Sequence, residues 1–201
     1  LAIAVVALSL ALFCAIGGTL AFLVAESNTV TNTFTYGDIN IELWENDYVL
    51  SSNSLDISKK VTSEDDYKMV PGNTMPKNPT VTVLKDSEAC WLFIQVEKTN
   101  NPDTYLDYAI HSCWTALAGE DGVYYYNGTD LDQLLTADKT YSILAGDKVT
   151  VKTTLTKTEM TNIGTNYPTL TFTAYAVQKA NVDNLADAWT IANNNGQLPT
   201  T

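Results

Sequence analysis

Arginine is absent from this chain of 201 residues, and its 11 basic residues are all lysines. The chain also has 23 aspartates and glutamates, so the formal net charge at pH 7 is −12. Nucleic-acid binding needs clustered cations on the phosphates and usually arginine to read the bases. The composition therefore argues against a nucleic-acid partner. The absence of arginine also means that no guanidinium group can bind a phosphate or carboxylate substrate through two parallel hydrogen bonds.

Histidine is also scarce, since His111 is the only one. Zinc peptidases commonly carry H-E-x-x-H on a helix, and this sequence does not contain that motif. His111 with Cys113 and Cys90 offers three ligands, fewer than the four of a closed zinc site. No G-x-S-x-G, P-loop or dinucleotide fingerprint occurs. We therefore predict no catalytic residues, no metal site and no enzymatic activity.

Charge is missing altogether from residues 1–25, which begin with the apolar block Leu1–Ile16. Small residues follow, and cleavage after Ala21 would leave Phe22 as the first mature residue. This layout is typical of a secretory signal peptide, and the block is shorter than the roughly 20 residues that span a bilayer. We predict a signal peptide over 1–21 and a secreted protein that reaches the extracellular matrix or cell surface. An uncleaved membrane anchor is the alternative.

Short alternating runs separated by Gly, Pro and Asn fill most of the mature chain. They predict an all-β fold, an antiparallel β-sandwich over 34–201. Cys90–Val96 is apolar on both parities, which is typical of a central strand covered on both faces or of a strand at a contact between two sheets. Thr104–Ile110 is expected to return beside it as a hairpin. Residues 46–66 are polar, and we expect a loop there.

One segment near the C-terminus has a helical period. Val182, Leu185, Ala186 and Trp189 fall at i, i+3, i+4 and i+7, and Asn181 precedes them as a possible N-cap. We expect one short C-terminal helix.

The mature chain retains two cysteines, Cys90 and Cys113. If the hairpin turns between Asn101 and Pro102, these two residues face each other directly across the strands and are within reach of a disulfide. If Pro102 instead takes position i+1 of the turn, the register moves by two and the pair becomes diagonal. An exported protein permits that oxidation. Two buried thiols are the alternative.

Four stretches, in this order along the chain, resemble the TasA/camelysin family of Gram-positive bacteria. They cover the signal region with the first strand, a turn, a tyrosine-rich run and the last strand with its helix. The stretches are 17–23 with 32–39, Lys68–Gly72, Trp114 with Asp121–Tyr126, and Thr173–Gln178 with Ala188–Trp189. The resemblance implies a signal peptide of the kind removed by the peptidase SipW. It also implies a jelly-roll sandwich that serves as a structural subunit of extracellular fibres in the biofilm matrix.

Family fibres are thought to form by donor-strand complementation, and the segment 22–33 suits that role. It starts apolar and becomes rich in Thr and Asn, so it extends readily but cannot form a sheet alone. We predict that it is an N-terminal arm whose donor-strand residues are Phe22, Leu23, Val24 and Val30. The main partner is then another copy of the chain, with other matrix or surface components as further candidates.

Two other functions stay open. The camelysin name suggests a secreted metallo-endopeptidase, against which the single histidine counts. A surface adhesion module is the other, for which the Tyr124–Tyr126 run could stack on a sugar, although core packing explains that run as well.

We predict no cofactor. The loops Glu64–Asp66, Glu120–Asp121 and Asp130–Asp132 carry oxygen ligands of the kind that Ca²⁺ prefers, but solvated carboxylates are the simpler interpretation.

Overall fold

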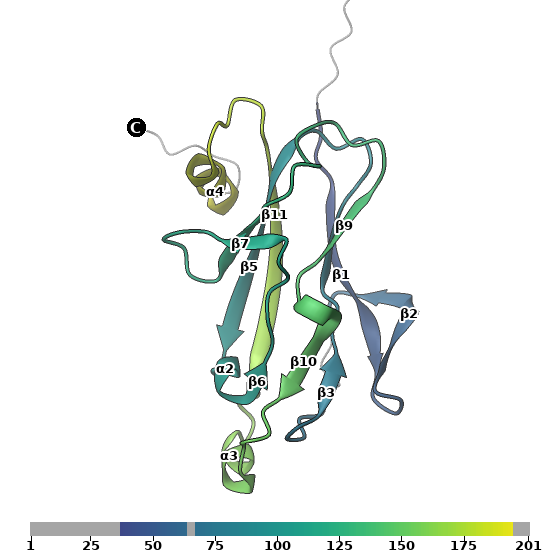
Figure 1. Cartoon of the computed structure of the whole chain (residues 1–201), viewed down its shortest axis with the longest axis vertical. Coiled ribbons are helices and arrows are strands. Elements are labelled where there is room, and N and C mark those ends of the chain that lie inside the picture. The colour runs from purple at the N-terminus through teal and green to yellow at the C-terminus, as the bar shows by residue number, and fades with distance from the viewer. Residues whose placement is uncertain (1–36, 64–66, 195–201) are drawn as a thin grey trace, which may run out of the picture. The chain divides into compact units, whose positions relative to one another are not determined.

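The computed structural model of the chain describes residues 37–63 and 67–194 (Figure 1). The predicted signal peptide and arm lie outside these residues. The described part forms eleven strands and a few short helices, so the fold is mostly β, and the expected predominance of strands is confirmed. The strands are β1 (Ile41–Val49), β2 (Ser54–Val61), β3 (Thr74–Pro76), β4 (Thr80–Val83), β5 (Cys90–Thr99), β6 (Leu106–Asp107), β7 (Trp114–Ala116), β8 (Val123–Tyr126), β9 (Lys139–Ser142), β10 (Lys148–Val151) and β11 (Thr169–Gln178).

Three antiparallel sheets contain these strands. Two have four strands each, in the orders β2-β1-β4-β9 and β11-β5-β8-β7. The third has the order β3-β10-β6 and was not expected from the sequence. The helices are α2 (Pro102–Tyr105), α3 (Lys157–Asn162), α4 (Leu185–Asn193) and the 3₁₀ turn η1 (Ala145–Asp147). Within the described residues, no helix is long and apolar enough to cross a bilayer.

The main core contains apolar side chains of both four-stranded sheets. Val81 and Val83 of β4 belong to one buried cluster with Leu92, Ile94 and Val96 of β5. The odd-numbered residues of β5 face the opposite side of the sheet, where Phe93 belongs to a second apolar cluster. The prediction of a central strand covered on both faces is therefore confirmed.

Helix α4 covers that second face of the β5 sheet, as Figure 1 shows. Its Trp189 is buried against Phe93 and Tyr175, with ring centroids 5.5 Å apart in both pairs. The predicted C-terminal helix is thus present, but it starts later than expected. Asn184, not Asn181, caps it by accepting the N–H of Asp187.

The predicted hairpin after β5 is wrong. Asn100 and Asn101 both adopt positive φ, and Pro102 then starts α2 instead of a returning strand. The following strand β6 pairs with β10 in the third sheet, while β5 pairs with β8 and β11. A proline is favourable in the first turn of a helix, which accounts for the change of direction.

The expected loop over 46–66 is also wrong, because β1 continues to Val49 and β2 pairs with it from Ser54 to Val61. The side chains of β2 are mostly exposed, so the strand shows no apolar alternation. Periodicity reveals a strand only when one face is buried.

Candidate strand-acceptor seam

Strand β11 ends its sheet and presents a long open edge. It pairs with β5 over all ten residues, from Thr169 opposite Thr99 to Gln178 opposite Cys90. Its other side has no strand partner within the described part of the chain. An edge of this kind offers a row of N–H and C=O groups to another strand.

The direction of these backbone groups follows from the hydrogen bonds at the two ends of β5. The Lys179 N–H donates to Ala89 O at 2.8 Å, whereas the Val96 N–H donates away from β11, to Gly122 O. Hydrogen-bonded and non-bonded pairs alternate along an antiparallel ladder. The N–H and C=O groups that face the open edge therefore belong to the even-numbered residues. These are Leu170, Phe172, Ala174, Ala176 and Gln178.

The core-facing side chains of β11 are incompletely covered. Leu170, Phe172, Ala174 and Ala176 pack against the main core, yet each is only partly buried. Their neighbours on β5 are almost completely buried, with Leu92 2% and Ile94 0% exposed. The core is thus closed at β5 and open to solvent one strand further out.

Among the residues that the structure describes, strand β1 of the other sheet has an open edge too, but over only half its length. Ile41–Trp44 pairs with β4, while β2 pairs with Glu45–Val49. The Leu84 N–H donates to Asn40 O, so by alternation the backbone groups of Ile41 and Leu43 point away from β4. The side chains of Ile41 and Leu43 are partly buried against the main core.

We call these two edges together the seam: Ile41–Trp44 of β1 and Thr169–Gln178 of β11. Cα atoms of the two strands approach within 8 Å, although no backbone hydrogen bond joins them in the part of the chain that the structure describes. A strand lying along the seam would pair with an edge and cover the half-buried side chains beneath it. The seam is therefore a candidate acceptor for a further strand.

The free side of β2, by contrast, is interrupted. The β1–β2 register shifts between Asn46 and Asp47, so the residues around Ile57 bulge out. Asp56 fixes the bulge by accepting hydrogen bonds from the N–H and hydroxyl of Ser58, and Ile57 is 87% exposed. Bulges and lysines on an edge discourage pairing with another chain, and β2 has both. Strand β11 has neither a bulge nor a lysine.

An open cavity of about 380 Å³ lies where β2 meets the open part of β1. Trp44, Lys60, Val61, Thr62 and Ser63 line it. The Trp44 indole N–H donates to Thr82 Oγ1 at 2.9 Å, and Lys60 Nζ lies 4.2 Å from the centre of the indole ring. The ring is therefore held on one side by the sheet and covered on the other by a lysine.

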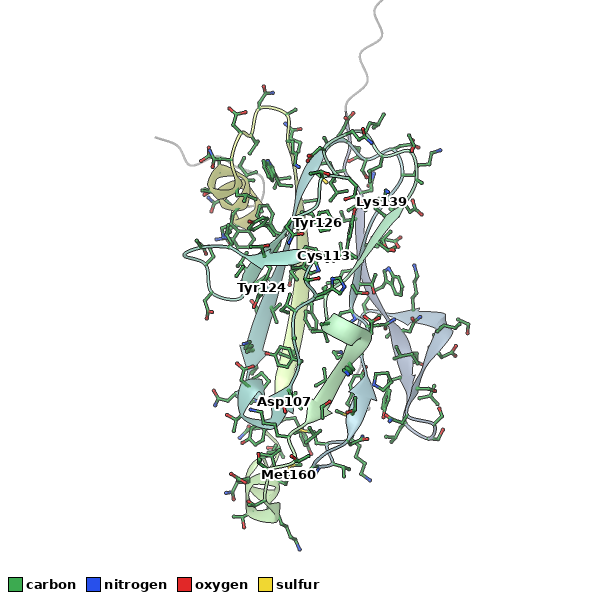
Figure 2. The ribbon with its side chains drawn as sticks, viewed as in Figure 1. Asp107, Cys113, Tyr124, Tyr126, Lys139 and Met160 are labelled. Carbon is green, nitrogen blue, oxygen red and sulfur yellow. The ribbon has the colours of Figure 1, made fainter. Side chains whose placement is uncertain are left out.

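The tyrosine run packs as alternation predicts. Tyr124 and Tyr126 belong to the main core cluster and Tyr125 to the second, so the run forms no continuous platform for a sugar. Tyr126 lies near Cys113 in Figure 2. Gly128 leaves room for this ring, because a Cβ atom at that position would overlap the hydroxyl end of Tyr126 unless the ring moved.

Asp130 joins two of the core tyrosines. Its carboxylate accepts the hydroxyl hydrogens of Tyr126 at 2.8 Å and Tyr141 at 3.0 Å. Partial burial opposes ionisation of Asp130, but these hydrogen bonds outweigh it and lower its pKa. Burial, and then the bond to Asp130, raises the pKa of Tyr126 to about 12. This part of the predicted acidic loop therefore stabilises the core.

The remaining acidic residues do not assemble. Asp132 pairs with Lys179, Glu120 and Asp121 lie in an exposed turn, and Glu64–Asp66 lies outside the described residues. In the described ranges 37–63 and 67–194, no three His, Cys, Asp or Glu side chains are grouped to hold a metal ion.

The two cysteines are free thiols in the structure. The register that predicted their bridge does not exist, because Cys90 lies opposite Gln178 and Cys113 precedes β7. Burial raises the pKa of Cys90 to about 11 and also raises that of Cys113. His111 Nδ1 lies 3.1 Å from Cys113 Sγ, so these two residues do meet, but the thiol is not activated.

The predicted donor residues Phe22, Leu23, Val24 and Val30, and the cleavage site at Ala21, lie outside the described residues. The sequence did not predict the seam. The one local signal for it is the uninterrupted ten-residue alternation of β11, which lacks lysine and proline.

No family model, no curated protein and no solved structure matches this chain.

Proposed function

We propose that this protein is a secreted structural subunit of extracellular fibres or biofilm matrix, with a jelly-roll-like sandwich completed by strand donation between copies. The observation that carries the proposal is the seam. Its ten-residue β11 edge is unpaired within the described residues, and the core-facing side chains along it are only partly buried. An added strand would satisfy the backbone groups and bury those side chains together.

The arm has the properties that this seam needs. Residues 22–36 precede the described domain, and fifteen extended residues reach roughly 50 Å. The arm starts with Phe22, Leu23 and Val24 and has one charged residue, Glu26. Its apolar start matches the uncovered core, and its Thr-rich remainder suits an edge strand.

Donation from each copy to the next is a head-to-tail contact. Such contacts need not close into a ring and can continue into a fibre. The alternative is that each arm covers the seam of its own domain and no fibre forms. The resemblance to the TasA/camelysin family supports the first outcome, and the interrupted edge of β2 supports the use of the seam rather than that edge.

Deletion of 22–33 from the secreted mature protein tests the proposal. We expect the full mature chain to form filaments, visible by negative stain, and the deletion variant to remain a folded monomer by circular dichroism and sedimentation. A control variant carries the same arm with Thr29 and Thr31 replaced by Ser, and it should still polymerise. Normal filaments from the deletion variant would show that strand donation by this arm is wrong.

A further inference from the structure

The seam has one open end and one closed end. Along β1 the closed end is Val61 of β2, which lies opposite Glu45, because β2 occupies the same edge of β1 beyond that point. At the other end, Asn40 precedes β1 and lies beside Ser87, near the end of β11 at Gln178. A strand that pairs with β1 can therefore enter only from the Asn40 end and must stop at Val61.

The cavity beside Trp44 lies at that closed end. Four of its five lining residues are the final residues of β2 and the two that follow. Lys60 covers the Trp44 ring, but the lysine side chain is 56% exposed and its ion pair with Glu42 is long, at 3.8 Å. Exposed pairs of this kind contribute little, so another apolar or aromatic group can displace the lysine from the ring.

We infer that this cavity receives the leading apolar residues, Phe22–Val24, of a second copy's arm. The inference rests on the proposed function and adds where the arm ends and in which direction it runs. The arm is joined to its own domain through Gly37, so that end must stay outside the seam. Its N-terminus therefore enters first and reaches the closed end.

The direction follows from the same geometry. Strand β1 runs from the open end to the closed end, whereas the arm runs from the closed end to the open end. The arm is then antiparallel to β1, which is the more stable pairing, and parallel to β11, which ends at Gln178 beside the open end. With Phe22 beside Trp44, the next residue, Leu23, has the opposite parity and faces the uncovered core near Leu43.

The length of the arm is sufficient for this placement. Positions 38–44 of the acceptor take seven arm residues, which leaves about eight of the residues 22–36 to link the two domains. A chain's own arm would have the same direction in its own seam. The test must therefore distinguish one copy from another.

Photo-cross-linking of filaments tests the inference. Mature protein with p-benzoylphenylalanine in place of Phe22 is mixed with ¹⁵N-labelled unmodified protein, polymerised and irradiated, and the cross-linked peptides are sequenced. We expect cross-links from position 22 of one copy to 44 or 60–63 of the other. A second probe at Thr33 should instead mark the open end, near Asn40 or Gln178.

The outcomes separate this inference from the proposed function. Cross-links from position 22 to the Asn40 end of another copy would overturn the direction and the cavity but leave strand donation intact. Cross-links from both probes that stay within one copy would overturn strand donation and this inference together.

Filling the cavity gives a second readout. Thr62→Trp places a large ring in it, whereas Thr158→Trp alters an exposed position of α3, which contributes no residue to the cavity. Losing the burial of one phenylalanine side chain corresponds to roughly ten- to hundredfold weaker association, so the critical concentration for filaments should rise by that factor in Thr62→Trp alone. Equal critical concentrations in the two variants would overturn the assignment of the cavity.

Discussion

Lys77 Nζ lies 2.8 Å from Glu45 Oε2 and 3.1 Å from Oε1, and only 13% and 9% of the two side chains are exposed. The Tyr67 ring lies 4.9 Å from the ammonium group. This pair joins β1 to the segment after β3. A buried ion pair adds little stability compared with an apolar pair, but the loss of one partner leaves an uncompensated charge.

Lys77→Met should therefore destabilise the domain by about 3–5 kcal/mol. Lys85→Met is the control, because its ion pair with Asp86 is 3.7 Å long and exposed, and its loss should cost about 1 kcal/mol or less. Urea unfolding measures both. The double variant Lys77→Met/Glu45→Leu should recover most of the loss. Equal effects of the two single variants would contradict the role given to this pair.

Asp130→Asn should cost about 1–2 kcal/mol at neutral pH, because two tyrosine hydroxyls lose their ionised acceptor. The folded state lowers the pKa of Asp130, so its contribution is fully present above the unfolded value and disappears as the pH falls below about 4. The difference in unfolding free energy between wild type and variant should thus shrink in acid. Asp121→Asn, in an exposed turn, is the control and should leave the unfolding free energy nearly unchanged. A difference that stays constant down to acid pH would argue against ionised Asp130 as the cause.

Ala174→Pro tests the open edge of β11 directly. The Ala174 N–H points away from β5, so proline removes a donor to the seam without breaking the β5–β11 ladder. We expect a folded domain with a similar melting temperature and no filaments. Tyr175→Pro removes an N–H that bonds to β5 and should unfold the domain. Filaments from Ala174→Pro would place the acceptor edge elsewhere.

The net charge of −12 predicts how assembly depends on salt. Like-charged copies repel, and the screening length falls from about 30 Å at 0.01 M salt to about 8 Å at 0.15 M. Filament yield, measured by sedimentation, should therefore rise with salt and on mild acidification. Filaments that dissolve as salt is added would instead indicate that attraction between opposite charges holds the copies together.

The cysteines give a further test. With the pKa of Cys90 raised to about 11 by burial, this thiol should resist a thiol reagent near pH 8 in the native state. Unfolding should release two reactive thiols per chain. Finding none after unfolding would show a Cys90–Cys113 disulfide in the secreted protein.

The sequence predicted strands best where burial of one or both faces produces a regular pattern of apolar residues. Both parities of β5 are apolar because both faces are covered, and the alternation of β8 places Tyr124 and Tyr125 in different clusters. Asn184 was missed as the cap of α4 because Asn181 lies one turn earlier and is an equally good capping residue.

Pairing between distant segments could not be predicted in this way. Strand β11 lies beside β5, whose residues are some 70–90 positions away in the sequence, and no local pattern specifies that partner. Local turn residues even suggested the wrong one, since Asn101 and Pro102 start a helix. The seam depends on which strands become edges, so only the assembled sheets reveal it.

The four tryptophans are all among the described residues, and Trp44 alone lies outside both apolar clusters. Trp91, Trp114 and Trp189 report on the packing of the interior. Trp44 instead lines the surface cavity beneath Lys60, a position that none of the other three shares. A lysine also covers Trp91, where Lys179 Nζ lies 4.4 Å from the ring centre, but Trp91 belongs to the second apolar cluster. A group that enters the cavity therefore changes the surroundings of Trp44 and of no other tryptophan. Intrinsic fluorescence of this chain therefore carries two separable signals, one from folding and one from the occupancy of a single surface cavity.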